Sequence, residues 1–143
     1  MTNRICLTQA KTIIEAAFAE GKALGLKPLS IAVLDAGGHI IAFERADGAS
    51  NLRFKIATGK AFGALALGMS SRKIADMAAD RPSFVASLGS IATDGIIPAA
   101  GGVIVVDQGG ATIGAVGVTG DTSDNDELCA LAGIAAAKLH PQG

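Results

Sequence analysis

Two apolar runs of this sequence end in the same turn signal, and this repetition restricts the fold more than any other feature of the chain. Val33-Leu34-Asp35-Ala36-Gly37-Gly38 and Val105-Val106-Asp107-Gln108-Gly109-Gly110 align at an offset of 72 positions. β-Branched runs favour strands, and Asp followed by Gly-Gly favours a tight turn that returns the chain antiparallel. We therefore predict two β-hairpins. Either a strand–turn–strand unit was duplicated, or each hairpin selected Asp and Gly independently, and the sequence leaves both interpretations open.

Helical periodicity and capping residues predict the remaining elements. The predicted elements are a helix from Thr8, its N-cap, to Gly21–Gly25; strands 29–34 and 39–45; a helix 51–67 capped by Ser50; a short helix capped by Ser70 or Ser71; another from Arg81-Pro82; strands 103–107 and 111–119; and a last helix capped by Asp124. Residues 93–102 are predicted to form a loop long enough to carry a function. This order predicts an α+β fold in a single domain, residues 1–143, with helices packed on a central antiparallel sheet.

Composition excludes several classes of partner. The 143 residues include 12 basic and 13 acidic side chains, no Trp, no Tyr and five Phe. Nucleic-acid binding is not expected, because it needs surplus positive charge and stacking rings. No stretch is long and apolar enough for a membrane span, and no signal-peptide pattern opens the chain, so we expect a cytoplasmic protein. A mean hydropathy of +0.45 indicates self-association into a dimer or a higher homo-oligomer.

Glycines lie in unusual places inside the predicted elements. They are Gly59 and Gly63 in the second helix, Gly101 and Gly102 at the start of the third strand, and Gly114 and Gly117 in the fourth. Glycine weakens helices and strands, so its presence there predicts the close approach of another backbone or of a ligand.

Two residues of the first hairpin could carry chemistry. His39 could bind a metal or heme iron or act as a general base, or it is an exposed histidine without a role. We place His39, Ile41, Phe43 and Arg45 on one face of the strand. If that face is buried, Arg45 could clamp a carboxylate or a propionate; otherwise it pairs with Glu44 or Asp47.

Lys60 lies between two glycines of the second helix and could reach an anion or exchange a proton, or it is simply solvated. Arg53 and Lys55 look like plain surface charges. The acidic residues at 121, 124, 126 and 127 favour complementing a helix dipole over holding a divalent cation, so no metal site is expected. Cys6 and Cys129 form neither a disulfide framework nor a metal motif, and we interpret both as buried hydrophobes.

Several segments together resemble the GlcG/HbpS family of heme-binding proteins, which includes the C-terminal domain of PduO-type proteins. The segments are Leu7-Thr8, residues 33–45, Lys60-Ala61, Gly101-Gly102-Val103 and residues 114–120. The resemblance implies a profilin-like sandwich, homo-oligomers, heme as the cofactor, and a role accessory to the catabolism of small organic molecules. The resemblance gives no fixed axial ligand, and the candidates are His39, Lys60, Thr119 and Cys129.

Three interpretations of function remain. The first is an oligomeric protein that binds heme or another small molecule. Its candidate binding residues are His39, Arg45, Lys60, Gly101, Gly102, Gly117 and Thr119. The second is a lyase, isomerase or hydrolase in which Arg45 holds a small carboxylate and Lys60 or His39 moves the proton. The third is a structural accessory subunit in which the small-residue surfaces pack protomers together.

Overall fold

A computed structural model describes residues 3–143 and contains both predicted hairpins and the predicted helices. The elements are α1 (Leu7–Ala23), β1 (Ser30–Asp35), β2 (Ile40–Arg45), α2 (Arg53–Leu67), α3 (Ser71–Asp80), α4 (Pro82–Leu88), β3 (Gly102–Val106), β4 (Thr112–Thr119), α5 (Ser123–Ala136) and β5 (His140–Pro141). The predicted α+β class is confirmed. The short strand β5 was not predicted.

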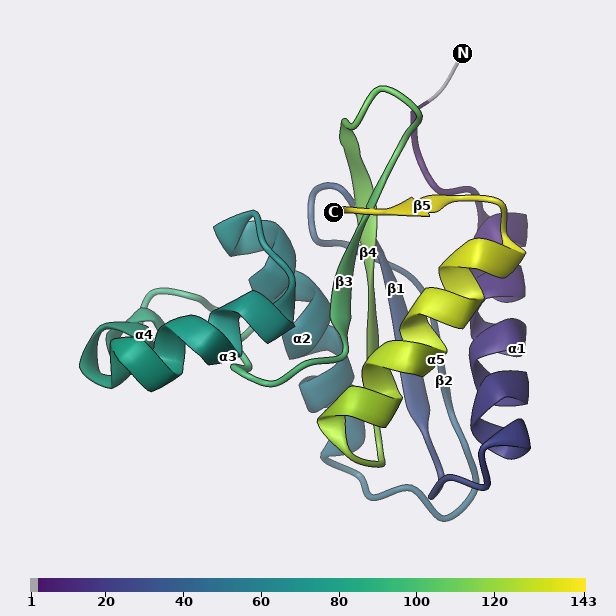
Figure 1. Ribbon diagram of the computed structural model, residues 1–143, viewed down its shortest axis with the longest axis horizontal. Coiled ribbons are helices and arrows are strands. Elements are labelled where there is room, and N and C mark those ends of the chain that lie inside the picture. The colour runs from purple at the N-terminus through teal and green to yellow at the C-terminus, as the bar shows by residue number, and fades with distance from the viewer. Residues whose placement is uncertain (1–2) are drawn as a thin grey trace.

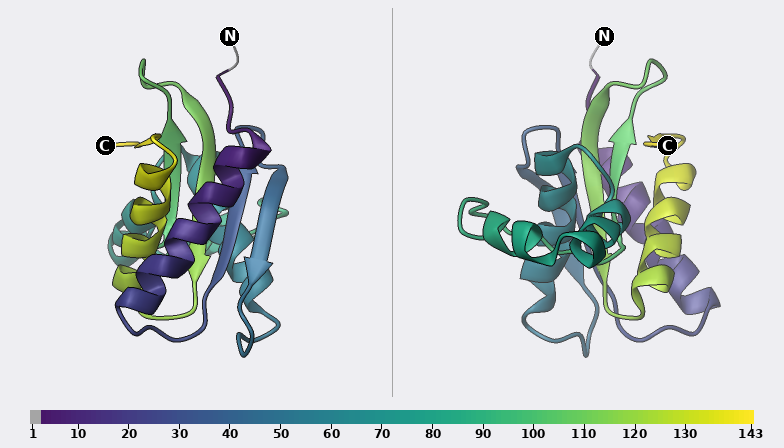
Figure 2. Two further views of the ribbon diagram at one scale, coloured as in Figure 1. Left: turned by 90° about the vertical axis from the view of Figure 1, so that its right-hand side faces the viewer. Right: turned by 60° about the vertical axis from the view of Figure 1, so that its left-hand side comes forward.

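The five strands form one antiparallel sheet in the order β2-β1-β4-β3-β5. Helices α1 and α5 cover one face, α2 covers the other, and α3 and α4 project away from the α2 side (Figures 1 and 2). The strands β1, β3 and β4 are therefore buried between two helical layers. The purple-to-yellow colouring shows that both ends of the chain contribute to the same layer.

The main apolar core lies between the sheet and the α1–α5 layer. Alternate β-branched residues of the central strands point into it, including Ile31, Val33, Val116 and Val118, and they meet Ile13 of α1. Strand side chains alternate between faces, so the intervening positions point toward α2. Several of those positions hold Gly, Ala or Ser, and they bring α2 close to the sheet.

Glycines of β3 and β4 make room for α2. A Cβ placed on Gly117 would collide with the carbonyl oxygen of Ala57, and one on Gly102 with that of Lys60. On the outer side of α2, Gly59 and Gly63 face the segment 94–97. The predicted close approach of backbone is confirmed at these positions, and the chain itself fills the space beside each glycine.

The two hairpin turns have the same hydrogen bonds. The Oδ1 atom of Asp35 accepts from the backbone N–H groups of Gly37 and His39, both at 2.9 Å. Asp107 accepts in the same way from Gly109 and Ala111, also at 2.9 Å. Turn chemistry alone therefore explains why both runs contain Asp and Gly at matching places.

Three predicted helix caps are wrong. Helix α1 begins one residue before Thr8, and the sulfur of Cys6 accepts from Gln9 N at 3.4 Å. Cys6 is exposed, so the interpretation of both cysteines as buried holds only for Cys129.

The other two wrong caps lie at α2 and α5. Helix α2 begins at Arg53 with no side-chain cap, so Ser50 does not cap it. Thr122, not Asp124, caps α5, because its hydroxyl accepts from Asn125 N. Ser70 caps α3, as predicted.

Candidate functional site

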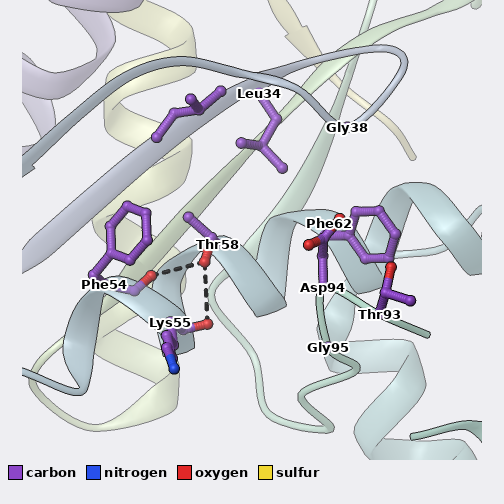
Figure 3. Close-up of a pocket in the computed structure, with 10 residues that line it drawn as sticks. Leu34, Gly38, Phe54, Lys55, Thr58, Phe62, Thr93, Asp94 and Gly95 are labelled. Carbon is purple, nitrogen blue, oxygen red and sulfur yellow. Dashed lines mark hydrogen bonds between the residues drawn. The ribbon is translucent and has the colours of Figure 1, made fainter. Parts of the chain in front are cut away.

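A pocket lies between the β1–β2 hairpin, helix α2 and the loop that follows α4 (Figure 3). Its volume is about 500 Å³, and its lining residues are Leu34, Gly38, Ile40, Phe54, Lys55, Thr58, Phe62, Thr93, Asp94 and Gly95. On α2 the residues Phe54, Thr58 and Phe62 are four positions apart, so the helix presents them on one side. None of the three was singled out from the sequence, although this spacing was visible there.

The few aromatic rings of the chain gather at this pocket. Phe54 and Phe62 line it, and the ring of Phe43 packs edge-on against Phe54 with centroids 4.8 Å apart. Phe54 remains 42% exposed and Ile40 50% exposed, so the wall is apolar yet open to solvent. Three of the five Phe residues therefore form one accessible apolar surface.

The polar groups of the pocket lie on its α2 and loop walls. The Thr58 hydroxyl donates to the carbonyls of Phe54 and Lys55, at 2.8 and 3.2 Å, so its proton is used within the helix. Lys55 is exposed, as predicted, but it belongs to the pocket lining and brings a positive charge to the rim. Asp94 supplies one carboxylate from the loop.

His39 lies between two pocket-lining residues, Gly38 and Ile40, but is itself outside the lining. Its side chain is 82% exposed, and Nδ1 lies 3.2 Å from Oδ1 of Asp35. The hydrogen bond from the His39 backbone and other contacts in this turn lower the pKa of Asp35, so the carboxylate stays ionised. An Nδ1–H donated to that carboxylate leaves the Nε2 lone pair available to an electrophile.

Lys60 is not solvated. Its side chain is 3% exposed, and Nζ donates to the carbonyl of Val118 at 3.0 Å and to Oδ2 of Asp126 at 3.2 Å. Burial lowers the pKa of Lys60, and Asp126 opposes that shift. The pair joins α2 to α5, and Gly101 lies directly against the ammonium group. Asp126 is thus the buried ion-pair partner of Lys60. Its place near a helix N-terminus does not indicate this role.

Arg53 is not a plain surface charge. Its guanidinium donates to the buried hydroxyl of Thr119 at 2.7 Å. Arg45 donates to Oδ1 of Asn51 at 2.7 Å, so the predicted pair with Glu44 or Asp47 is wrong.

An irregularity in the pairing of β1 with β2 changes the predicted face of β2. Between Val33 and Leu34 the register shifts. Ile41 consequently packs into the α1–α5 core, whereas Ile40 lines the pocket on the opposite face. Arg45 pairs in register with Ser30, which pairs with Thr119. Arg45 therefore lies on the α2 face with Phe43, and the prediction that Ile41 shares that face is wrong.

The structure divides the predicted site residues into two groups. Lys60, Gly101, Gly102, Gly117 and Thr119 meet where α2 crosses β3 and β4. His39 and Arg45 lie at opposite ends of β2, about 20 Å apart at the usual rise of a strand. One small carboxylate cannot contact both of them in a single chain.

Among residues 3–143, no group of three or more His, Cys, Asp or Glu side chains is arranged to hold a metal ion. Two of the carboxylates near the start of α5, Asp124 and Glu127, pair with Arg72 of α3. Within the same described part of the chain, no helix has the length and apolarity needed to cross a membrane.

The fold defines an α+β sandwich with a five-stranded antiparallel sheet, and solved structures share it. The chain is 29% identical to HbpS, with a TM-score of 0.80 over 94% of this chain and 91% of that one. It is 26% identical to the Klebsiella pneumoniae protein ORFY, with a TM-score of 0.85 over 96% and 93%. The PduOC:heme complex, 21% identical over 98% and 99%, shares the fold with a TM-score of 0.86.

Residues 5–135 match the family described as haem degrading protein HbpS-like, and the chain belongs to that family. It is also 32% identical over 127 residues to the "uncharacterized 15.0 kDa protein in dhaT-dhaS intergenic region" of Citrobacter freundii. That match covers 88% of this chain and 87% of the relative. The resemblance inferred from the sequence is therefore confirmed.

Proposed function

We propose that this protein binds heme in the pocket between α2 and the β1–β2 hairpin. The observation that carries the proposal is the gathering of Phe43, Phe54 and Phe62 at one open apolar pocket in a chain with few aromatic rings. The family description and the structural likeness to HbpS support the same ligand. The third similar structure, PduOC, is a heme complex.

The residues at the pocket fit the chemistry of heme. A volume of about 500 Å³ lies within the range of roughly 300–1,000 Å³ that is typical of ligand pockets. The Phe rings suit the porphyrin face, and Lys55 is placed to pair with a propionate. His39 would supply an iron ligand through Nε2, because Asp35 holds Nδ1 as carboxylates hold metal-binding histidines elsewhere. Bound heme would supply redox chemistry that the side chains lack.

The other predicted axial ligands are less well placed. Lys60 and Thr119 are buried beneath α2, and each is already hydrogen-bonded. Cys129 is buried in the core on the other side of the sheet. His39 is the candidate whose ring is exposed beside the pocket, with Nδ1 held by Asp35 and Nε2 left over for a ligand bond.

We extend the proposal to assembly and context. Exposed apolar side chains support a homo-oligomer: Phe84 of α4, Ile91 in the turn after α4, and Leu52 just before α2. The proposal treats residues 1–143 as one domain in a cytoplasmic protein with an accessory role in catabolism. Sedimentation of the purified protein at several concentrations tests the assembly, and a single monomeric species at all of them would contradict it.

Hemin titration tests the ligand. We expect a saturable Soret shift at one hemin per chain. Phe54→Ala should weaken binding about ten-fold or more, because the side chain contributes roughly 1.5–3 kcal/mol of apolar burial. Phe84→Ala is the matched control, since Phe84 is 41% exposed, close to the 42% of Phe54, and lies on α4 away from the pocket.

A second matched pair tests the iron ligand. His39→Ala should change the Soret position, whereas His140→Ala at the far edge of the sheet should not. Equal hemin affinity for the two Phe variants, or no saturable shift in the unmodified protein, would refute heme binding at this pocket.

A further inference from the structure

A buried hydroxyl group on the α2 face of the sheet has no partner. Ser30 is fully buried, and its Oγ atom makes no hydrogen bond to any of residues 3–143. Ser30 pairs in register with Arg45 on one side and with Thr119 on the other. Directly paired residues of antiparallel strands point to the same face, so the three side chains form a row across β2, β1 and β4. A buried donor without an acceptor is costly, which indicates a missing partner.

The first turn of α2 lies over this row. Arg53, the first residue of the helix, donates to Oγ1 of Thr119. Asn51, just before the helix, accepts from Arg45. No side chain caps the N-terminus of α2, and its first turn contains no acidic residue. A helix N-terminus in this condition presents amide N–H groups and partial positive charge to the space beside it.

Positive charge at this corner exceeds the negative charge paired with it. Among the described residues, neither Arg45 nor Arg53 has a carboxylate within 4.0 Å. Burial lowers the pKa of Lys60, and the nearby Arg53 lowers it further, so these two cations repel each other. Asp126 is the carboxylate within reach of Lys60, and it is already hydrogen-bonded to Asp121 N as well.

We propose that the N-terminus of α2, together with Ser30, Arg45, Arg53 and Thr119, binds a small oxyanion, either a carboxylate or a phosphate. The planar guanidinium groups match the paired oxygens of such an anion. The Ser30 hydroxyl donates its unused proton at the inner side of the site. The Arg53 amide already donates to the Ser50 carbonyl, so the amides of Phe54 and Lys55 in the first turn of α2 donate from above. This site adjoins the pocket proposed for heme, because Phe54 and Lys55 of the first turn of α2 line that pocket, but Ser30, Arg45, Arg53 and Thr119 lie outside the lining.

Titration of the protein with sodium phosphate and then sodium acetate, at constant ionic strength, tests the site. Amide and Arg Nε signals in proton–nitrogen spectra report the binding, and sodium chloride is the reference. We expect saturable shifts at residues 30, 45, 53 and 119, with a dissociation constant on the order of 1 mM. The oxyanion that saturates at the lower concentration identifies the preferred class, and saturation by chloride alone at the same residues would overturn the proposal.

Variants separate binding from general charge effects. Ser30→Ala should weaken phosphate or acetate binding about five-fold while leaving the thermal midpoint unchanged or higher, because it removes a buried donor without a partner. Arg45→Ala should weaken binding about ten-fold. Arg81→Ala removes the same charge from the α3–α4 junction and should change affinity less than two-fold. Equal affinity of the unmodified protein and Ser30→Ala would show that water serves the hydroxyl, and the proposal would be wrong.

Discussion

Removal of the negative charge from Asp126 should destabilise the protein far more than is usual for an acidic residue at a helix N-terminus, because Asp126 is buried. In the folded state Asp126 accepts from Lys60 Nζ at 3.2 Å and from Asp121 N at 2.9 Å. Asp126→Asn retains an oxygen for the backbone donor but leaves the Lys60 ammonium buried with only the carbonyl of Val118. Breaking a buried ion pair from one side costs about 3–5 kcal/mol, a large part of a total stability of roughly 5–15 kcal/mol.

Urea unfolding followed by circular dichroism measures this loss, and the same helix supplies the control. Asp124→Asn removes a carboxylate that is 80% exposed and paired with Arg72, so it should cost at most about 1 kcal/mol. Lys60→Met combined with Asp126→Asn removes both buried charges. That double variant should recover most of the loss, since an apolar replacement of a buried pair is often close to neutral.

The pH dependence gives a second readout. Burial lowers the pKa of Lys60 below 10.5, and loss of Asp126 removes the charge that opposes this shift. The unfolded chain then binds more protons than the folded one, so the stability of Asp126→Asn should rise as the pH rises toward 10.5. The gap from the unmodified protein should therefore narrow at alkaline pH. A cost below about 1 kcal/mol, or strictly additive effects of the two substitutions, would refute the reasoning.

Three further outcomes are expected. Gly117→Ala should lower stability by about 1–3 kcal/mol in thermal unfolding, because the new methyl group meets the Ala57 carbonyl. Gly89→Ala is the control and should be nearly neutral. Similar thermal midpoints for the two variants would contradict the packing described. Hydrogen bonds from Asn125 and from backbone amides lower the pKa of Asp121 from 3.8 to about 2. The stability that the Asp121 carboxylate adds is therefore present above pH 3.8 and lost as the pH falls toward 2. Asp121→Asn should make the free energy of unfolding less dependent on pH over that range, and an unchanged pH dependence would argue against this role. Burial raises the pKa of Cys129 to about 11, so a disulfide reagent at pH 8 should titrate one thiol, Cys6, in the native protein, and rapid reaction of two would show that the core is open.

Local chemistry explains which parts of the fold the sequence predicts well. Both hairpins depend on an Asp that bonds to amides two and four residues later, so the signal lies within a few positions. The caps are harder to predict. Helix α1 is capped by the sulfur of Cys6, which is not a usual capping residue, and α2 has no side-chain cap. Before α5, several Thr, Ser and Asp residues follow one another, and the geometry selects Thr122. Strand β5 has only two residues and depends on the edge of β3, which no local pattern reveals.

In the candidate sites, too, features set by nearby residues can be predicted from the sequence, and features set by distant residues cannot. The pocket wall on α2 follows from the four-residue spacing of Phe54, Thr58 and Phe62, and periodicity could have predicted it. The environment of Lys60 could not be predicted, because its partner Asp126 is 66 residues away in the sequence. The register shift in the β1–β2 pairing moved Ile41 to the other face, and a simple alternation rule has no means to anticipate it.

The glycine contacts beneath α2 have a consequence for how any ligand enters the molecule. Helices that rest on side chains can slide or tilt as those side chains change rotamer. Helix α2 instead rests on the bare backbone of Gly102 and Gly117, with its own carbonyl groups against them. At these two points no side chain can yield to a displacement, so this part of the helix is a fixed wall. Any widening of the pocket must therefore come from the hairpin or from residues 93–95, and substitutions there can alter which ligands enter without loosening the sheet.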